Sequence, residues 1–156
     1  PCITNILKDN AEIKPSNSYN KKDIIGENYR NIVPLVDYLG TGYKIKITIS
    51  GNAKYYLLDT GASDLVIDRD TERELLLDGS LKRENYLDKQ NYFLANNQTV
   101  KAQLIKMDKL SIGDYTVNNV VIAILDEGSL LCGKSFLDKF SKWELDKEHK
   151  VLILYK

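Results

Sequence analysis

The stretch Leu57-Leu58-Asp59-Thr60-Gly61-Ala62-Ser63 places a carboxylate at the end of an apolar run and directly before a turn. A glycine two positions after the aspartate lets the backbone turn tightly and brings peptide N–H groups toward the carboxylate. Thr60 supplies a hydroxyl that can be buried against another chain, and Ser63 can donate a hydrogen bond to the outer carboxylate oxygen. The stretch therefore predicts an acid held in a fixed orientation, as catalysis by proton transfer requires.

Upstream of this turn, the sequence predicts a β-hairpin. Isoleucines at positions 45, 47 and 49 alternate with polar residues, which indicates a strand with one buried face. Ser50-Gly51-Asn52 predicts the hairpin turn, after which the chain returns through residues 55–58 into Asp59. The aspartate is thus expected at the end of a strand. Beyond it, residues 65–67 predict a second short strand, and residues 68–77 predict a helix with an acidic start.

The second half of the chain also has the short, closely spaced apolar runs of a mostly-β domain. Residues 92–94 and 100–105 flank Asn96-Asn97-Gln98, a hairpin tip that tolerates positive φ, and Gly113-Asp114 predicts another hairpin. The run 120–125 is too continuously apolar for a half-exposed strand and is expected in the core. Helical turns are expected over residues 135–140, and a last hairpin over residues 143–146 and 151–155.

Two motifs of this sequence resemble motifs of the retropepsin-like aspartic proteases and occur in the same order as in that family. Tyr55 to Ser63 resembles their active-site strand, and Leu131-Cys132-Gly133 resembles the hydrophobic-hydrophobic-glycine element that follows. The similarity extends from about residue 32 to residue 156, and further matching segments are Ala95-Asn96-Asn97, Ser111-Ile112-Gly113, Leu130 to Leu137 and Trp143 to Asp146. It implies a mostly-β fold, a closed acid-protease barrel with a flap hairpin and one or two short helices.

The resemblance also implies a function and a set of site residues. Asp59 would be the catalytic carboxylate of an aspartic endopeptidase, and the chain offers one Asp-Thr-Gly. Because the family uses two carboxylates, the resemblance implies a homodimer that acts on a peptide or protein substrate without metal or cofactor. Asn97 stands where glycine is more usual and Cys132 where an aliphatic residue is expected, and both remain compatible with activity. The implied supporting, flap and glycine-element residues are Thr60, Gly61, Ala62 and Ser63, then Leu94, Ala95, Asn96 and Asn97, then Leu131, Cys132 and Gly133.

Alternatives to this function remain open at the level of sequence. One is a catalytically silent protease-fold module for dimerisation or peptide binding. Another is a Cys-His enzyme, with Cys132 as nucleophile and His149, the single histidine, as base. A His-ligated zinc site is disfavoured because such sites recruit two or three histidines. Asp64 and Asp68 are expected to be solvent-facing or capping groups.

Composition and charge exclude several other classes. The 156 residues fit one domain, and the 22 basic residues balance 22 acidic ones, so nucleic acid is not an expected partner. The apolar runs are too short for a membrane span.

Residues 1–30 are polar and predict an arm or tether, followed by the protease domain over residues 31–156.

Cys2 and the missing initial methionine bear on localisation. A start at Pro1 is compatible with processing of a longer precursor, and Cys2 with lipid attachment in a bacterial cell envelope. An incidental thiol is the other interpretation, because Pro1 fits such a site poorly. We therefore expect a bacterial envelope or periplasmic protein.

Overall fold

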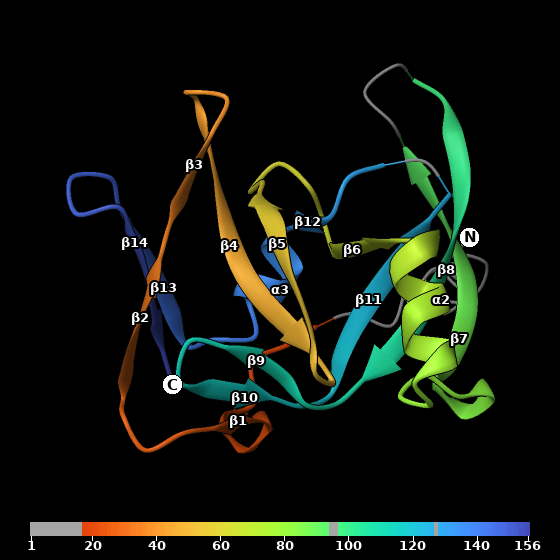
Figure 1. Cartoon of the computed structure of the whole chain (residues 1–156), viewed down its shortest axis with the longest axis horizontal. Coiled ribbons are helices and arrows are strands. Elements are labelled where there is room, and N and C mark those ends of the chain that lie inside the picture. The colour runs from red at the N-terminus through yellow and green to blue at the C-terminus, as the bar shows by residue number, and fades with distance from the viewer. Residues whose placement is uncertain (1–16, 94–96, 127) are drawn as a thin grey trace, which may run out of the picture.

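A computed structural model describes residues 17–93, 97–126 and 128–156 (Figure 1). These residues are mostly β-structure with two short α-helices, as the sequence predicted. The larger sheet has eleven strands, and β3 (Val36–Tyr38) joins it by pairing with β4 beside the main path. The strands along this path are, in spatial order, β1 (Ile24–Ile25), β10 (Tyr115–Val117), β9 (Leu110–Ile112), β4 (Gly42–Ile49), β5 (Asn52–Leu58), β12 (Leu131–Cys132), β6 (Leu65–Asp68), β11 (Val120–Leu125), β8 (Thr99–Met107) and β7 (Tyr86–Phe93).

This order is open where a closed barrel was expected. Within the described ranges β1 and β7 lie at opposite ends of the path, and no pairing joins them. Closure needs two end strands that can continue one hydrogen-bonded ladder. Here β1 has only 2 residues, and the β7–β8 ladder shifts register between Tyr86 and Lys89. The expected mostly-β fold is therefore present, without a continuous barrel wall in the described residues.

The predicted hairpin before Asp59 is confirmed. Ile45, Ile47 and Ile49 are buried, and the turn between β4 and β5 places Ser50 and Gly51 at positive φ. The apolar run that was expected in the core forms β11, which lies between β6 and β8 and is buried from Val120 to Ile124. These strands provide a rigid support for the turn that follows β5.

The helices lie against the large sheet and are short. In α2 (Arg69–Leu77), the N-cap is Asp68, whose Oδ1 accepts hydrogen bonds from Thr71 N at 2.8 Å and Thr71 Oγ1 at 2.6 Å. Burial alone would raise the pKa of Asp68, but these hydrogen bonds outweigh it and lower the pKa. The capping role expected for Asp68 is confirmed. The other helical segments are α3 (Lys134–Leu137), shorter than the helical turns expected there, and the 3₁₀ turns η1 (Lys21–Asp23) and η2 (Arg83–Asn85).

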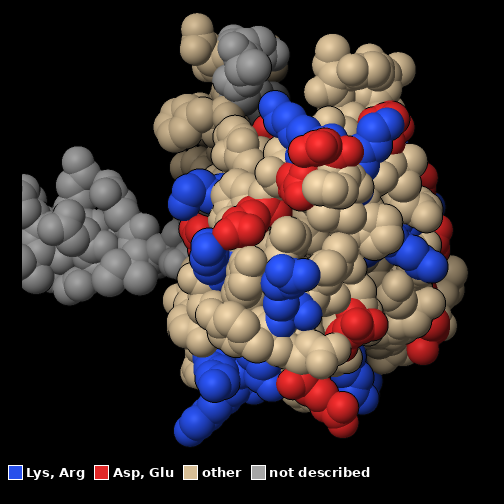
Figure 2. Space-filling view, turned by 90° about the vertical axis from the view of Figure 1, so that its left-hand side faces the viewer, with Lys and Arg blue, Asp and Glu red and all other residues tan. Residues whose placement is uncertain are grey.

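A second, three-stranded sheet lies beside the first. Its strand order is β13 (Lys142–Asp146), β14 (Val151–Tyr155) and β2 (Arg30–Pro34), so the final hairpin is confirmed. Seen from this side of the molecule, acidic and basic side chains are intermixed and not separated by sign (Figure 2). No helix in the described ranges is long and apolar enough to cross a membrane.

Residues 17–30, part of the expected polar arm, pack against the domain where a loosely packed arm was expected. Ile24 is buried and pairs with Val117 of β10. Asp23 forms a 2.7 Å ion pair with Lys139, whose side chain is 1% exposed. These contacts compensate for the low apolar content that suggested a tether. The boundary expected at residue 31 stays a prediction, and Cys2 lies outside the described residues.

Candidate active site

The end of β5 positions Asp59 through backbone pairing with the segment around β12. Leu57 N donates to Leu130 O at 2.9 Å, and Asp59 N donates to Cys132 O at 3.0 Å. Because these bonds are two residues apart on both segments, they continue one parallel ladder, and Leu57 and Asp59 lie on the same face of the strand. The carboxylate is half-buried at the end of this strand.

The turn after Asp59 folds back onto the carboxylate. Gly61 N donates to Asp59 Oδ1 at 3.0 Å, as expected for a glycine at this position. Ala62 N donates to the backbone oxygen of Asp59, also at 3.0 Å. Thr60 is exposed in the single chain, so its hydroxyl is accessible to another molecule. The turn thus fixes one carboxylate oxygen by a backbone donor.

A second set of backbone bonds joins this turn to the start of α3. Lys134 N donates to Ala62 O at 2.9 Å, Ser135 N donates to Ser63 O at 2.8 Å, and Gly133 N donates to Asp64 O at 3.1 Å. The approach is so close that a Cβ atom on Gly133 would lie 2.4 Å from Asp64 O and 2.8 Å from Ala62 O. Only glycine fits between the two segments. The two motifs that the sequence singled out are therefore neighbours in the structure.

Asp64 is buried, which corrects the expectation of a solvent-facing or capping group. Its side chain is 2% exposed, Ser135 Oγ donates to Oδ1 at 2.9 Å, and the hydroxyl of Tyr92 donates to Oδ2. Ser63 Oγ also contacts Asp64 Oδ2, at 3.4 Å, where a bond to Asp59 was expected. Hydroxyl donors satisfy a carboxylate that would otherwise be costly to bury.

Sequence reasoning missed this network because its donors lie far from Asp64 along the chain. Tyr92 is 28 residues away and Ser135 is 71 residues away. Neither forms a local motif with Asp64. The one available signal was the position of Ser135 two residues after Gly133, inside the resemblance to the retropepsin-like proteases.

The hairpin expected to be the flap is formed by β7 and β8, with Tyr92 pointing toward Asp64 and Phe93 exposed. Burial raises the pKa of Tyr92, and its hydrogen bond to Asp64 raises it further. Asn97 has φ of 66°, the positive value predicted for the tip. The other expected flap residues, Leu94, Ala95 and Asn96, lie outside the described residues.

The Cys-His alternative is wrong on geometric grounds. Cys132 is 0% exposed, and burial raises the pKa of its thiol, which disfavours the reactive thiolate. His149 lies in the exposed turn between β13 and β14, where its Nδ1 is 2.8 Å from Asp146 Oδ2. A nucleophile and its base must lie within hydrogen-bond reach, and these residues have other neighbours.

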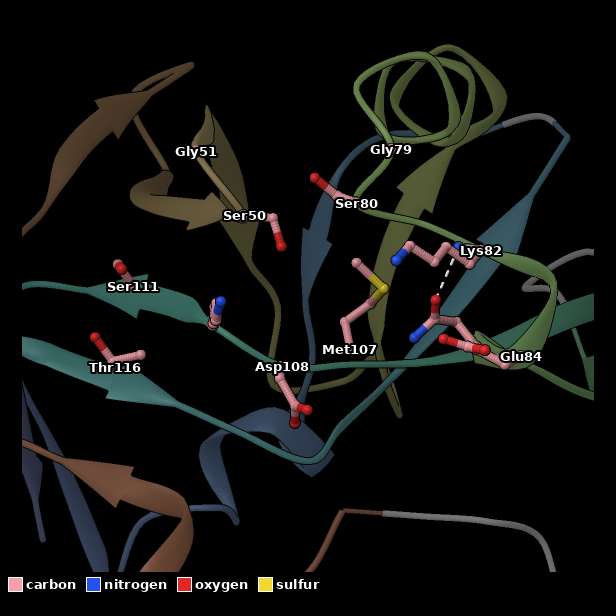
Figure 3. A pocket seen from close by; sticks show the side chains of 12 residues that line it. Ser50, Gly51, Gly79, Ser80, Lys82, Glu84, Met107, Asp108, Ser111 and Thr116 are labelled. Carbon is pink, nitrogen blue, oxygen red and sulfur yellow. Dashed lines mark hydrogen bonds between the residues drawn. The ribbon is translucent and has the colours of Figure 1, made fainter.

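A cavity of about 660 Å³ opens at the other end of β5 (Figure 3). Ser50 and Gly51 line it, together with Lys82, Met107 and Asp108. At about 3.3 Å per residue, the length of β5 separates this cavity from Asp59 by roughly 25 Å. It is therefore distinct from the candidate active site. Within the described ranges, no group of three or more His, Cys, Asp or Glu side chains is placed to hold a metal ion.

The strand order and the turn at Asp59 define a retropepsin-like fold. The solved structure of a retropepsin-like aspartic protease from Rickettsia conorii is similar to this chain, with a TM-score of 0.60 and 22% sequence identity over 84% of this chain and 92% of that one. The family model described as "Aspartyl protease" matches residues 45–136. The chain therefore belongs to the aspartyl protease family. No curated protein is similar enough to count as a match.

Proposed function

We propose that this chain is an aspartic endopeptidase in which the Asp59 carboxylates of two identical subunits hydrolyse a peptide bond. The observation that carries the proposal is the position of Asp59, half-buried at the end of β5 and oriented by the 3.0 Å hydrogen bond from Gly61 N. Membership of the aspartyl protease family supports the same chemistry.

The mechanism needs two carboxylates that act together. In aspartic proteases in general, two such groups about 3 Å apart cannot both be ionised and share one proton. The ionised group takes a proton from a water molecule, whose oxygen attacks the scissile carbonyl, while the protonated group donates to the carbonyl oxygen. Collapse of the tetrahedral intermediate then transfers a proton to the leaving nitrogen, and no covalent enzyme intermediate forms.

Other carboxylates near the turn have structural partners, which supports a dyad of two Asp59 residues. Asp64 is buried against hydroxyl donors, and Asp68 caps α2. Asp126, the carboxylate directly after β11, lies 2.6 Å from Arg69 Nε. A second Asp59 would come from a two-fold symmetric partner, and the exposure of Thr60 leaves its hydroxyl free to contact that partner.

The substrate we propose is an extended peptide that lies under the β7–β8 flap. An extended chain can pair its backbone with a hairpin and present alternate side chains to pockets on either side. Closure of the hairpin over the peptide would exclude water from the reacting carbonyl. For localisation, we propose a bacterial envelope or periplasm, an expectation that depends on Cys2.

A cleavage assay tests the proposal. Purified wild-type protein and Asp59→Asn would be incubated with a mixed peptide library from acid to neutral pH, and the products identified by mass spectrometry. We expect cleavage by the wild type and a loss of at least about a thousandfold in Asp59→Asn. Asp70→Asn is the matched control, because that carboxylate is 77% exposed.

Sedimentation analysis at the assay concentrations tests the dimer. Activity should follow the dimer fraction as the protein is diluted. Equal cleavage by wild type and Asp59→Asn would overturn the mechanism, and activity in a strictly monomeric sample would overturn the two-subunit dyad. Absence of cleavage together with peptide binding would favour the silent-module alternative.

A further inference from the structure

The face of β5 that carries Leu57 and Asp59 continues across β4 and β3. Lys44 of β4 is the cross-strand neighbour of Leu57, and Val36 of β3 is the neighbour of Lys44. Residues directly opposite each other in an antiparallel pair lie on the same face of the sheet. Lys44 is therefore one strand away from Leu57, on the face of the candidate catalytic carboxylate.

A cavity of about 210 Å³ is present on this face, lined by Tyr38, Lys44, Tyr55, Leu57, Ser129 and Leu130. Leu130 belongs to the segment that pairs with β5 just before Asp59, since Leu130 O accepts the hydrogen bond from Leu57 N. Sites for drug-sized ligands measure about 300–1,000 Å³. The cavity is below that range and suits a single side chain beside the catalytic turn.

The charge on this face is positive. The Lys44 ammonium lies 4.2 Å from the centroid of the Tyr38 ring, and among the described residues no carboxylate forms an ion pair with it. Apart from Asp59, which directly follows β5, the residues of β3, β4 and β5 on this face include Lys44 and Lys46 and no aspartate or glutamate. A cation–π contact directs the ammonium without neutralising its charge.

We propose that this cavity is a specificity pocket in which Lys44 binds an acidic side chain of the substrate close to the cleaved bond. The inference rests on the proposed peptidase function and names a substrate class for it. Leu57 and Leu130 supply an apolar wall for the methylene groups of a glutamate, while Lys44 supplies the partner for its carboxylate. A lysine or arginine at the same substrate position would be repelled.

Matched peptides that differ at one position test this inference. A cleaved sequence from the library would be resynthesised with Glu, Gln or Lys at each of the four positions on either side of the cleaved bond. We expect Glu to raise kcat/KM over Gln at one of these positions by roughly five- to tenfold, the effect of one ion pair at a partly exposed site. The Glu-to-Gln ratio should fall toward one in Lys44→Gln and return in Lys44→Arg.

The control is Lys147→Gln, which removes the same charge from the turn between β13 and β14 and is not among the residues that line this cavity. Its Glu-to-Gln ratio should equal that of the wild type. In Lys44→Glu the preference should move to the lysine peptide. A wild-type ratio near one at every position, or a ratio that survives in Lys44→Gln, would overturn the inference while leaving the Asp59 mechanism intact.

Binding provides a readout that does not depend on catalysis. Fluorescence anisotropy with the uncleaved Glu and Gln peptides on Asp59→Asn should show tighter binding of the Glu peptide. This difference should disappear in Asp59→Asn combined with Lys44→Gln. Equal binding of the two peptides to Asp59→Asn would count against the pocket even if the wild type cleaves both.

Discussion

The turn at Asp59 and the expected flap hairpin are held to the molecule in different ways. Residues 59–64 are joined to residues 132–135 by backbone hydrogen bonds, which Gly133 makes possible by close approach. Among the described residues, β7 is an edge strand whose one partner is β8, and Tyr92 adds a side-chain contact to Asp64. Backbone hydrogen bonds fix the carboxylate, whereas β7 is held by its pairing with β8 and by the contact of Tyr92. The turn therefore fixes the position of the Asp59 carboxylate, whereas the β7–β8 hairpin can adjust its own position.

The largest effect is expected when the close approach in the turn is blocked. In Gly133→Ala, the new methyl group would meet the backbone of Asp64 and Ala62, and neither segment can move without breaking hydrogen bonds. We expect a loss of about 3 kcal/mol in the free energy of unfolding, together with loss of cleavage. Urea denaturation measures the first and the peptide assay the second.

Gly42→Ala is the control for that substitution, since a Cβ there makes ordinary contact with Leu57 Cδ1 at 3.4 Å. Its free energy of unfolding should change by less than about 1 kcal/mol. Equal stability of Gly133→Ala and Gly42→Ala would show that the turn is not held by close packing.

An intermediate effect is expected where the two regions meet. Asp64→Ala leaves the partly buried hydroxyls of Tyr92 and Ser135 without their carboxylate and should lower stability by about 2 kcal/mol. Tyr92→Phe should lower it by about 1 kcal/mol and raise KM more than it lowers kcat, because β7 loses this contact while Asp64 keeps its hydrogen bond from Ser135.

The double variant measures the coupling between these residues. If Tyr92 acts through Asp64, the two stability changes will fall short of additivity by about 1 kcal/mol in urea unfolding. Additive changes would mean that the flap and the turn contribute to stability independently, although the structure shows a hydrogen bond between them.

A smaller effect is expected at Asp68, outside both regions. Asp68→Ala removes the N-cap of α2 and should lower stability by about 1 kcal/mol at neutral pH. The hydrogen bonds from Thr71 hold the pKa of Asp68 below its ordinary value of 3.8, so its contribution is complete above that pH and is lost as pH falls through the folded-state pKa. Unfolding measured from pH 7 to pH 3 should therefore show the difference shrinking in acid. A difference that grows as pH falls would contradict this sign.

The smallest effect on stability is expected at Phe93, at the end of β7. Its side chain is 83% exposed, so Phe93→Ser should change the free energy of unfolding by less than about 0.5 kcal/mol. If the flap covers the substrate, KM should still rise. Unchanged kinetics in this variant would separate the exposed face of β7 from substrate binding.

Local patterns predicted the parts of this fold that depend on neighbouring residues. The alternation at residues 45–49, the turn at Ser50-Gly51 and the cap at Asp68 follow from strand, turn and helix chemistry within a few positions. The proximity of Asp59 and Gly133 came from resemblance, because no local rule joins residues so far apart. Membership of the aspartyl protease family supports that inference.

The features that the sequence did not reveal depend on distant partners. Asp64 looked like a surface residue because the hydroxyls that allow its burial belong to β7 and α3. Residues 17–30 were expected to belong to a polar tether, because polar composition does not reveal contacts such as the side-chain hydrogen bonds of 2.8 Å and 3.1 Å between Asn17 and Val121. The prediction of a closed barrel was wrong for a related reason, because closure depends on how two end strands that are distant in the sequence meet.

The ion pair between Asp23 and Lys139 has a consequence for the way this sequence can change over time. The two residues are 116 positions apart, and the lysine is almost fully enclosed. Losing one partner strands a buried charge, whereas replacing both with apolar residues can be neutral or even favourable. The two positions should therefore vary together among descendants of this chain, so that η1 and the turn after α3 are inherited as one unit.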